Sequence, residues 1–446
     1  MQRTSRVILI LILATSISYG QKVLSLTDAI NIALQRNTTI QKSINTLATT
    51  KKAAETSYGQ LLPSVSANGS WSWDRTESKN GGSVSVYGGN IAVRTNETRS
   101  YNAGINTSWT LYDGLANISA MNQSKNAYES AKLTLEKLKQ DIVFNTISYY
   151  YDVVNNEALV KVKEEDLKTQ QKNLETISER NKLGAVTLAD VYKQQYVVGN
   201  AELLLVTAKN TYETSKSNLL YYLGIDVLEN YTITDVDSSK LNTGINFSKD
   251  YSDIADLVAK ALKNRSDYQS LKLDLQNSYE SIVQAKSGHL PTLTNSMSFG
   301  LSSNDISSLF DTKRYSVGLT LGIPIFSGWS VDNKVQAAKA DAMNKEVDLS
   351  DLERTIKLNI QKNYLDLQAT EKQIEVCKKN VVSSDESKKI VTEKYSLGSG
   401  TLLDVISAIA DYTTAQSNLV TTQYNYAKLK AQIKYLLGIL DYNKFE

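Results

Sequence analysis

The sequence predicts a mixed α and β fold, in which a long antiparallel α-helical barrel continues into a twelve-stranded transmembrane β-barrel shared by three chains, four strands from each. Three observations lead to this prediction: an internal duplication, four segments in which polar and apolar residues alternate, and two long proline-free segments with apolar residues at every seventh position. Such patterns predict strands and coiled-coil helices, and large compact cores are not expected.

Two stretches of the chain repeat each other in the same order. Leu62-Pro63 returns as Leu290-Pro291, an offset of 291 − 63 = 228 residues. Leu183-Gly184 returns as Leu397-Gly398, an offset of 397 − 183 = 214 residues. The change of 228 − 214 = 14 residues falls inside a Gly-, Asn- and Ser-rich stretch at 76–98. A duplication whose length changes only in a loop indicates two complete structural units.

The duplication sets the expected order of segments. Each repeat is predicted to contain a helix, a strand hairpin, a long helix and a further helix. The boundaries are 1–20 for a signal peptide, 21–224 for the first repeat with its hairpin at about 64–111, 225–252 for a linker, 253–438 for the second repeat with its hairpin at about 292–325, and 439–446 for a C-terminal tail.

Composition excludes several functional classes. The chain has 446 residues, is 41% hydrophobic and carries a net charge of +2. Acidic and basic residues are interspersed along the helices, so no nucleic-acid partner is expected. Cys377 and His289 are each the only residue of their type, which leaves no disulfide within one chain and no set of nucleophile, base and orienting group. We therefore expect neither a cofactor nor enzymatic activity. An enzyme whose active site lies inside the barrel is one alternative to this expectation.

The N-terminus predicts the compartment. Arg3 and Arg6 precede an apolar run at 7–13, and small residues follow up to Ser18-Tyr19-Gly20. This order of zones is typical of a secretory signal peptide. The run is shorter than the roughly 20 apolar residues that a transmembrane helix needs. The mature chain is therefore expected to be exported, and either to be soluble or to enter a membrane as strands.

The four alternating segments are predicted strands, two in each repeat. Each is about 10 residues long or slightly longer, the length of a tilted strand that crosses a membrane. Their second face carries almost only small polar residues and glycine. The apolar positions are Val65, Ala67, Gly69, Trp71 and Trp73; Tyr101, Ala103, Ile105, Trp109 and Leu111; Leu293, Met297, Phe299 and Leu301; and Tyr315, Val317, Leu319, Leu321, Ile323 and Ile325.

This alternation has two interpretations. A soluble hairpin with one buried face would show it as well. The export signal, the small residues of the polar face and the aromatic residues near the segment ends favour contact with lipid, because aromatic girdles mark membrane interfaces. The predicted interface aromatics are Trp73, Tyr101, Trp109, Tyr315, Phe326 and Trp329.

Four strands cannot close a barrel alone, and lipid does not tolerate open sheet edges. Two copies would give eight strands, whose interior side chains fill, whereas three copies give twelve strands and leave room for water. Because the polar face resembles the lining of a watery lumen, three copies are the better prediction.

The helices are expected to be long and packed as coiled coils. No proline occurs at about 115–183 or 329–397, and apolar residues recur every seven positions. The flanking helical stretches, about 25–60, 187–222, 253–289 and 401–437, are each half as long. Two of them stacked end to end match one long helix, so a hollow tube is predicted. The heptad positions are Val153, Val160, Leu167 and Leu174, then Leu367, Ile374 and Val381.

Several motifs, duplicated in order, resemble the outer membrane efflux protein family, the TolC-like proteins. The resemblance covers essentially the whole mature chain. It rests on Ala29, Ala33, Leu34 and Asn37 of the first helix, on Leu-Pro before each first strand, on Pro324-Ile325-Phe326-Ser327-Gly328, on Leu-Gly and Asp-Val in each half, and on Tyr435-Leu436-Leu437-Gly438.

The resemblance implies a homotrimeric exit duct in the outer membrane of a Gram-negative bacterium, with a large periplasmic part and contact with lipid. It implies as partners a periplasmic adaptor (membrane fusion) protein and an inner-membrane pump, in a tripartite efflux or type I secretion system. Small molecules, metals or polypeptides would pass without chemistry by the duct. By the same analogy, 225–250 would form a belt around the middle of the tube.

The turns between long and short helices are the predicted functional site. Gly184 and Gly398 suit helix C-termini, and Thr187 and Thr401 suit N-caps. The resemblance adds adaptor docking at Leu183, Gly184, Thr187, Leu397, Gly398, Gly400 and Thr401, and a periplasmic entrance or gate at Asp404, Ser407, Asp190 and Tyr395.

This sequence departs from the family pattern at two of these positions. Ser407 stands where the family has a second aspartate, and Gly400 where some members have an arginine. A weaker acidic ring with one carboxylate per chain is therefore expected. The alternative to a duct is a non-transporting periplasmic or surface coiled-coil protein, structural or adhesive, which would be extracted without detergent.

Overall fold

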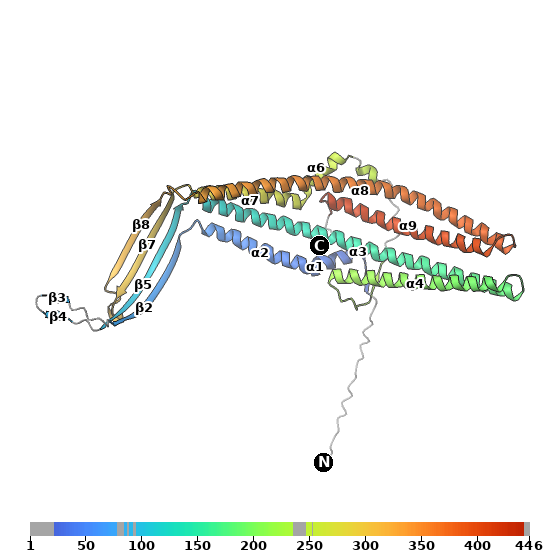
Figure 1. Ribbon diagram of the computed structural model, residues 1–446, viewed down its shortest axis with the longest axis horizontal. Helices are drawn as coiled ribbons and strands as arrows, with labels where there is room; N and C mark the ends of the chain where they lie inside the picture. Colours follow the sequence, from blue (N-terminus) through green and yellow to red (C-terminus); the bar gives the residue numbers. More distant parts are fainter. Residues whose placement is uncertain are drawn as a thin grey trace, which may run out of the picture.

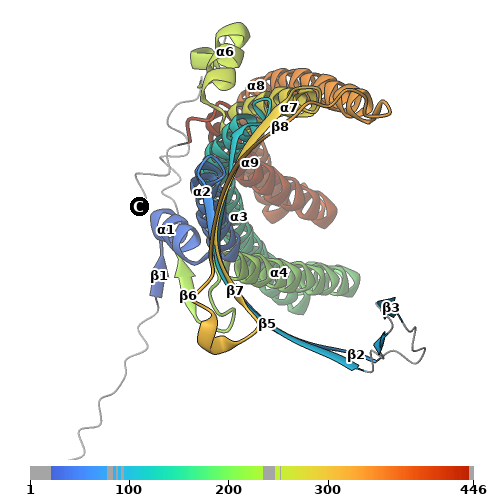
Figure 2. The same cartoon turned by 90° about the vertical axis from the view of Figure 1, so that its left-hand side faces the viewer.

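The computed structural model describes residues 22–77, 84–86, 89–91, 95–234, 247–251 and 253–440. The predicted signal peptide, parts of the 76–98 loop and the 225–252 linker, and 441–446 of the predicted tail lie outside the described residues. The chain is elongated, with a sheet at one end and helices that run from it to the other end (Figure 1). Viewed along its length, the chain forms a curved wall (Figure 2).

Two helices of 67 residues each run along this wall, so each is about 100 Å long at 1.5 Å per residue. The other helices are shorter and lie beside them. The helices are α1 (Leu26–Arg36), α2 (Thr38–Gly59), α3 (Ala116–Lys182), α4 (Leu188–Leu223), α6 (Ile254–Asn264), α7 (Ser266–Ser287), α8 (Ser330–Ser396) and α9 (Leu402–Leu436), with 3₁₀ helices η1 (Phe247–Tyr251) and η2 (Ile306–Ser308).

The helices pack side by side in the same order along the wall. Next to the sheet the order is α2, α3, α7, α8, and towards the far end it is α4, α3, α9, α8 (Figure 1). The end of α4 meets the start of α2, where Gly224 lies against Arg36. The end of α9 meets the start of α7, where the Arg265 guanidinium donates a hydrogen bond to the Leu436 carbonyl at 3.2 Å. Short helices thus stack end to end beside the long ones, as predicted.

The first helical stretch of each repeat is broken, whereas a single helix was expected at about 25–60 and 253–289. Asn37 and Arg265 both have extended backbones, with ψ near 120°. Asn37 accepts a hydrogen bond from the Thr39 amide at 2.9 Å and so begins α2 as an N-cap. The break lets the preceding helix leave the wall and frees the start of the next one to meet α4 or α9.

The sheet has four antiparallel strands in the order β2, β5, β7, β8. β7 joins the two repeats by pairing with β5, with a bulge between Thr110 and Tyr112. β8 ends before Pro324, earlier than the predicted end near 325, because proline has no amide to donate to a ladder. The strands are β2 (Ser64–Glu77), β5 (Thr95–Tyr112), β7 (Thr292–Ser303) and β8 (Lys313–Gly322); the smaller pairs are β1 (Lys22–Leu24) with β6 (Tyr231–Ile233) and β3 (Val84–Val86) with β4 (Gly89–Ile91).

Buried apolar side chains lie between neighbouring helices of the wall. One cluster surrounds α1, α3 and the end of α4, a second joins α6, α8 and α9, and a third lies at the far end. The heptad positions Val153, Leu367 and Ile374 are among the buried residues. Coiled-coil positions therefore contribute to the packing of the wall. Among the described helices, none combines the length and apolarity that a membrane-crossing helix requires.

Gly114 lies in the junction between β5 and α3. Its surroundings predict how much a substitution at this junction destabilises the protein. Its φ is 72°, and a β-carbon there would lie 2.9 Å from the Leu290 β-carbon. Gly184 has the same φ, with nothing within 4 Å of a β-carbon. Both alanine variants share a left-handed backbone cost of about 1–2 kcal/mol. We expect Gly114→Ala to lower the thermal unfolding midpoint clearly more than Gly184→Ala, measured by circular dichroism in detergent. Equal shifts would contradict this account of the junction.

Candidate functional site

Two turns at the end of the wall farthest from the sheet connect α3 to α4 and α8 to α9 (Figure 1). Gly184 and Gly398 follow the last helical residues with φ of 72° and 79°. The Ala185 amide donates to the Arg180 carbonyl at 2.8 Å, and the Ser399 amide to the Lys394 carbonyl at 2.9 Å. These bonds complete a Schellman motif in each turn. Both long helices therefore end in the same rigid way.

Both turns continue into a capping box. Thr187 caps α4 and donates its hydroxyl proton to Asp190 at 2.8 Å. Thr401 caps α9 and donates to Asp404 at 2.6 Å. Each aspartate also accepts from the backbone amide of its threonine. The two predicted gate aspartates thus have the same local role, which is to satisfy the free amides at a helix start.

Asp404 is an exposed, ionised carboxylate. Hydrogen bonds from the Thr401 hydroxyl and then from its amide lower the pKa of Asp404 below its ordinary value. The carboxylate therefore keeps its negative charge at neutral pH and into the acidic range. Ser407 is exposed on α9 one turn later. Each chain thus places one fixed negative charge at this point of the tip.

Arg180, in the last turn of α3, joins the two tips. Its guanidinium donates to the carbonyls of Tyr395 and Ser396, both at 3.3 Å, and lies 5.1 Å from the centre of the Tyr395 ring. These carbonyls belong to the C-terminal end of α8, where a cation is favoured. The contact combines hydrogen bonding, the helix dipole and a cation–π interaction. Arg180 was not among the predicted site residues.

Tyr395 lies at the centre of this contact. Burial raises the pKa of its phenol, the charge of Arg180 opposes this rise, and the charge of Asp190 adds to it. Its hydroxyl is buried and has no hydrogen-bond partner among the described residues. The structure therefore brings the predicted residue Tyr395 close to Arg180 and within electrostatic range of Asp190. Below them, Ile177, Val191 and Leu402 form the small buried cluster of the tip.

The residues predicted for docking surround the two turns. Leu183 and Leu397 are 83% and 76% exposed, although leucine is usually buried. Leu188 and Leu403 add exposed apolar surface at the start of α4 and α9. The tip thus presents four exposed leucines at the end of the wall. Among the residues that the structure describes, no group of three or more His, Cys, Asp or Glu could hold a metal ion.

The predicted interface aromatics lie at both ends of the sheet. Trp73, Tyr101 and Tyr315 lie on the half of their strands farther from the helices. Trp109 lies near the helices, where its indole donates to the Leu61 carbonyl at 3.0 Å. Phe326 and Trp329 follow β8 at the same end and contact each other edge to face. The six residues therefore lie at two levels of the sheet, one nearer the helices and one farther from them.

A curved wall of long helices, continued by strands with one apolar and one polar face, defines a channel-forming protein of the outer membrane. The family model described as "Outer membrane efflux protein" matches residues 29–225 and 257–439. The chain belongs to the outer membrane efflux protein family.

Known relatives and solved structures agree with this assignment. The chain is 24% identical over 359 residues to outer membrane protein TolC of Salmonella enteritidis, covering 78% of this chain and 70% of that protein. It is 25% identical over 322 residues to TolC of Escherichia coli, covering 69% of this chain and 64% of that protein, which is less than two thirds of its length. The Campylobacter jejuni CmeC outer membrane channel has a TM-score of 0.79 at 18% identity, covering 94% of this chain and 88% of that chain.

Four predictions are thereby confirmed: the TolC-like family, the fold class, the function as an efflux channel and the outer membrane location. The family and these neighbours are channel proteins and not enzymes. The roles of individual residues at the tip and at the membrane interface stay predictions.

Arg180 yields a prediction about the tip. Removing its charge breaks two hydrogen bonds and the ring contact that join α3 to α8. We expect Arg180→Gln to loosen the tip and to raise single-channel conductance at least about twofold, because charge-assisted hydrogen bonds hold the two turns together. Planar lipid bilayers would measure this.

The matched control is Lys182→Gln. Lys182 lies two residues further along α3 and makes an exposed ion pair with Glu179, which contributes little. Its conductance should equal that of the wild type. An increase of the same size in both variants would show that net charge, and not the link between tips, sets the conductance.

Proposed function

We propose that three copies of the chain form one continuous duct, which receives cargo from a periplasmic adaptor and an inner-membrane pump and releases it outside the cell. One observation carries this proposal: each chain is a sector with two different open edges. One edge consists of β2, α2 and α4, and the other of β8 and α8. Unlike edges that meet head to tail generate a closed ring when the rotation from one copy to the next closes.

The sheet favours three copies. β2 and β8 each pair on one side only within the described chain. Lipid requires their remaining backbone groups to be bonded, which another copy can provide. Two copies would give an eight-stranded barrel that side chains fill, whereas three give twelve strands with space for water. The small polar residues of the inner face suit the second case.

The helical edges support the same assembly. Tyr192, Tyr196, Leu203 and Val206 lie on α4 at coiled-coil spacing, with Gly199 between them. All four are exposed in the single chain, Tyr196 to 76%. This stripe lies opposite the face that packs on α3. On the other edge, α8 exposes Val376 and Ile390, two heptads apart. Two unfilled seams of this kind are complementary surfaces for neighbouring copies.

The tips support contact with an adaptor. Their four exposed leucines lie at the end that would face the inner membrane, and three copies would place six turns around one entrance. Exposed leucines gathered at two neighbouring turns are typical of a protein-binding surface. Three Asp404 carboxylates would surround the entrance and attract cations, while small molecules, metals or polypeptides pass through by diffusion along the lumen.

Assembly can be tested on the α4 stripe. We expect wild-type protein, extracted with detergent from the membrane fraction, to have the native mass of three chains. Leu203→Glu places a charge in the seam and should reduce the trimer fraction at least about tenfold, since burying an unpaired charge is costly. Lys193→Glu, on the same helix but off the stripe, should remain trimeric. Release of a monomer or dimer without detergent would contradict the shared barrel and favour a soluble coiled-coil protein.

Adaptor contact can be tested by cross-linking in the native bacterium. Leu183→Cys in a Cys377→Ser background places one reactive thiol at the tip. Phe310→Cys, in the exposed turn between β7 and β8, is the control at the opposite end. A thiol-reactive cross-linker should join Leu183→Cys, and not Phe310→Cys, to a protein that mass spectrometry identifies as a membrane-anchored periplasmic adaptor. Equal capture by both thiols, or capture by neither in cells that export efficiently, would contradict docking at the tip.

A further inference from the structure

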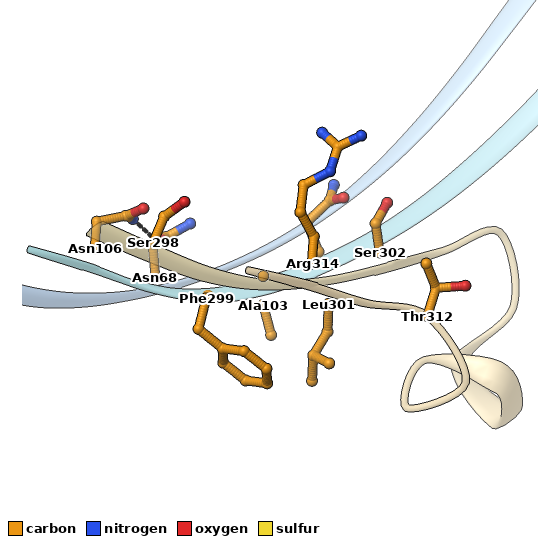
Figure 3. Close-up of a pocket in the computed structure, with 12 residues that line it drawn as sticks. Asn68, Ala103, Asn106, Ser298, Phe299, Leu301, Ser302, Thr312 and Arg314 are labelled. Carbon is orange, nitrogen blue, oxygen red and sulfur yellow. Dashed lines mark hydrogen bonds between the residues drawn. The ribbon is translucent and has the colours of Figure 1, made fainter. Parts of the chain in front are cut away.

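One row of the sheet differs from every other row on its polar face. The register pairs Asn68 with Gly104, Gly104 with Gly300, and Gly300 with Arg314. The row therefore begins with an amide, crosses two glycines and ends with a guanidinium. In Figure 3 the Arg314 side chain rises from the same side of the sheet as Asn106, Ser298 and Ser302, whereas Phe299 and Leu301 extend from the opposite side.

Arg314 is the one charged residue on the polar face between the helices and the level of Ser72. The polar-face positions of 64–72, 100–110, 292–302 and 314–322 are otherwise Ser, Thr, Asn or Gly. Within the described part of the chain, no carboxylate forms an ion pair with Arg314. Its positive charge is therefore not neutralised by any of the residues that the structure describes in the same chain.

The two glycines leave space beside the guanidinium. A cavity of about 510 Å³ lies over this row, lined by Asn68, Asn102, Asn106, Ser298 and Ser302 among others. A β-carbon at Gly104 would come within 3.0 Å of the Phe299 carbonyl, so a larger residue there would crowd the floor of the cavity. Beside the guanidinium, Asn106 donates one hydrogen bond to Asn68 at 2.7 Å, and the remaining amide and hydroxyl protons of the lining can be donated to a ligand.

We propose that Arg314 is the centre of an anion-binding site in the lumen of the β-barrel, which takes phosphate, sulfate or carboxylate groups. The planar guanidinium binds such groups through two parallel hydrogen bonds. The inference rests on the proposed trimer, in which the polar face lines the lumen. Three copies then place three guanidinium groups at one level, and rings of arginine are typical of pores that select anions.

Asp74 is the carboxylate that could oppose this site. By the alternation of β2 it lies on the polar face, beyond Ser72 and farther from the helices. Because β2 and β8 are the two edge strands, Asp74 of one copy and Arg314 of the next lie on adjoining strands of the closed barrel. If the two paired, the cation would be neutralised, so the experiment includes Asp74→Asn.

The experiment uses the full chain in planar lipid bilayers with pyrophosphate as the probe, added to one side of the membrane and then to the other. We expect pyrophosphate to reduce the wild-type current when it is added on the side of the membrane that the β7–β8 turn faces. Arg314→Gln should raise at least tenfold the pyrophosphate concentration that halves the current. Arg314→Lys should give an intermediate value, because lysine keeps the positive charge but lacks the planar group that makes two parallel hydrogen bonds. Lys313→Gln, a neighbouring change whose side chain lies on the apolar face, should block like the wild type.

The remaining outcomes would contradict either the proposed duct or the proposed anion site. Wild-type protein that forms no conducting pores contradicts the proposed duct. Pores that conduct but are blocked equally in wild type and Arg314→Gln overturn the anion site while leaving the duct intact. An equal loss of block in Lys313→Gln also overturns it, since net charge alone would then explain the effect. Block that occurs only in Asp74→Asn shows that a neighbouring copy neutralises Arg314, and the site is again rejected.

Discussion

The structure depends on the unpaired backbone of two edge strands. β2 and β8 each offer a row of amide and carbonyl groups on the side that no strand of the same chain covers. In lipid these groups must be bonded, and only other strands can bond them all. The wall of helices has the corresponding two edges, since α2 leads into β2 and β8 leads into α8. A single chain is thus one sector of a larger closed object.

Much of this architecture could be predicted from the sequence, because its patterns have long periods. Alternation over about ten residues indicates which face of a strand is apolar, and apolar residues at every seventh position, from Val153 to Leu174 and from Leu367 to Val381, indicate a coiled-coil seam. Single residues that break a pattern were harder to recognise. Asn37 and Arg265 end helices without proline or glycine, so composition gave no sign of the breaks. Arg180 contacts Tyr395, which is 215 positions further along the chain. A local sequence pattern cannot indicate a contact over such a separation.

The two repeats stabilise the corresponding helix break by different polar contacts. In the first repeat Asn37 caps α2 through its amide oxygen. In the second, Arg265 is buried, bonds the end of α9 and pairs with Asp267. Burial alone would raise the pKa of Asp267, but the hydrogen bonds and charge of Arg265 lower it overall. The carboxylate is therefore ionised at neutral pH, and its contribution to stability is lost as the pH falls through its lowered pKa. The duplicated frame has kept its geometry while its polar contacts diverged.

The unequal lengths of the helices have a mechanical consequence. α3 and α8 run without interruption past the level at which their neighbours meet end to end, at Gly224 and at Gly438. A bundle of continuous rods and jointed rods does not bend evenly, because a joint lacks the hydrogen bonds that stiffen a helix. Deformation applied at the tips is therefore carried by the long rods and absorbed mainly at that one level. The strands beyond it are spared, so a displacement of the tips would leave the shape of the sheet unchanged.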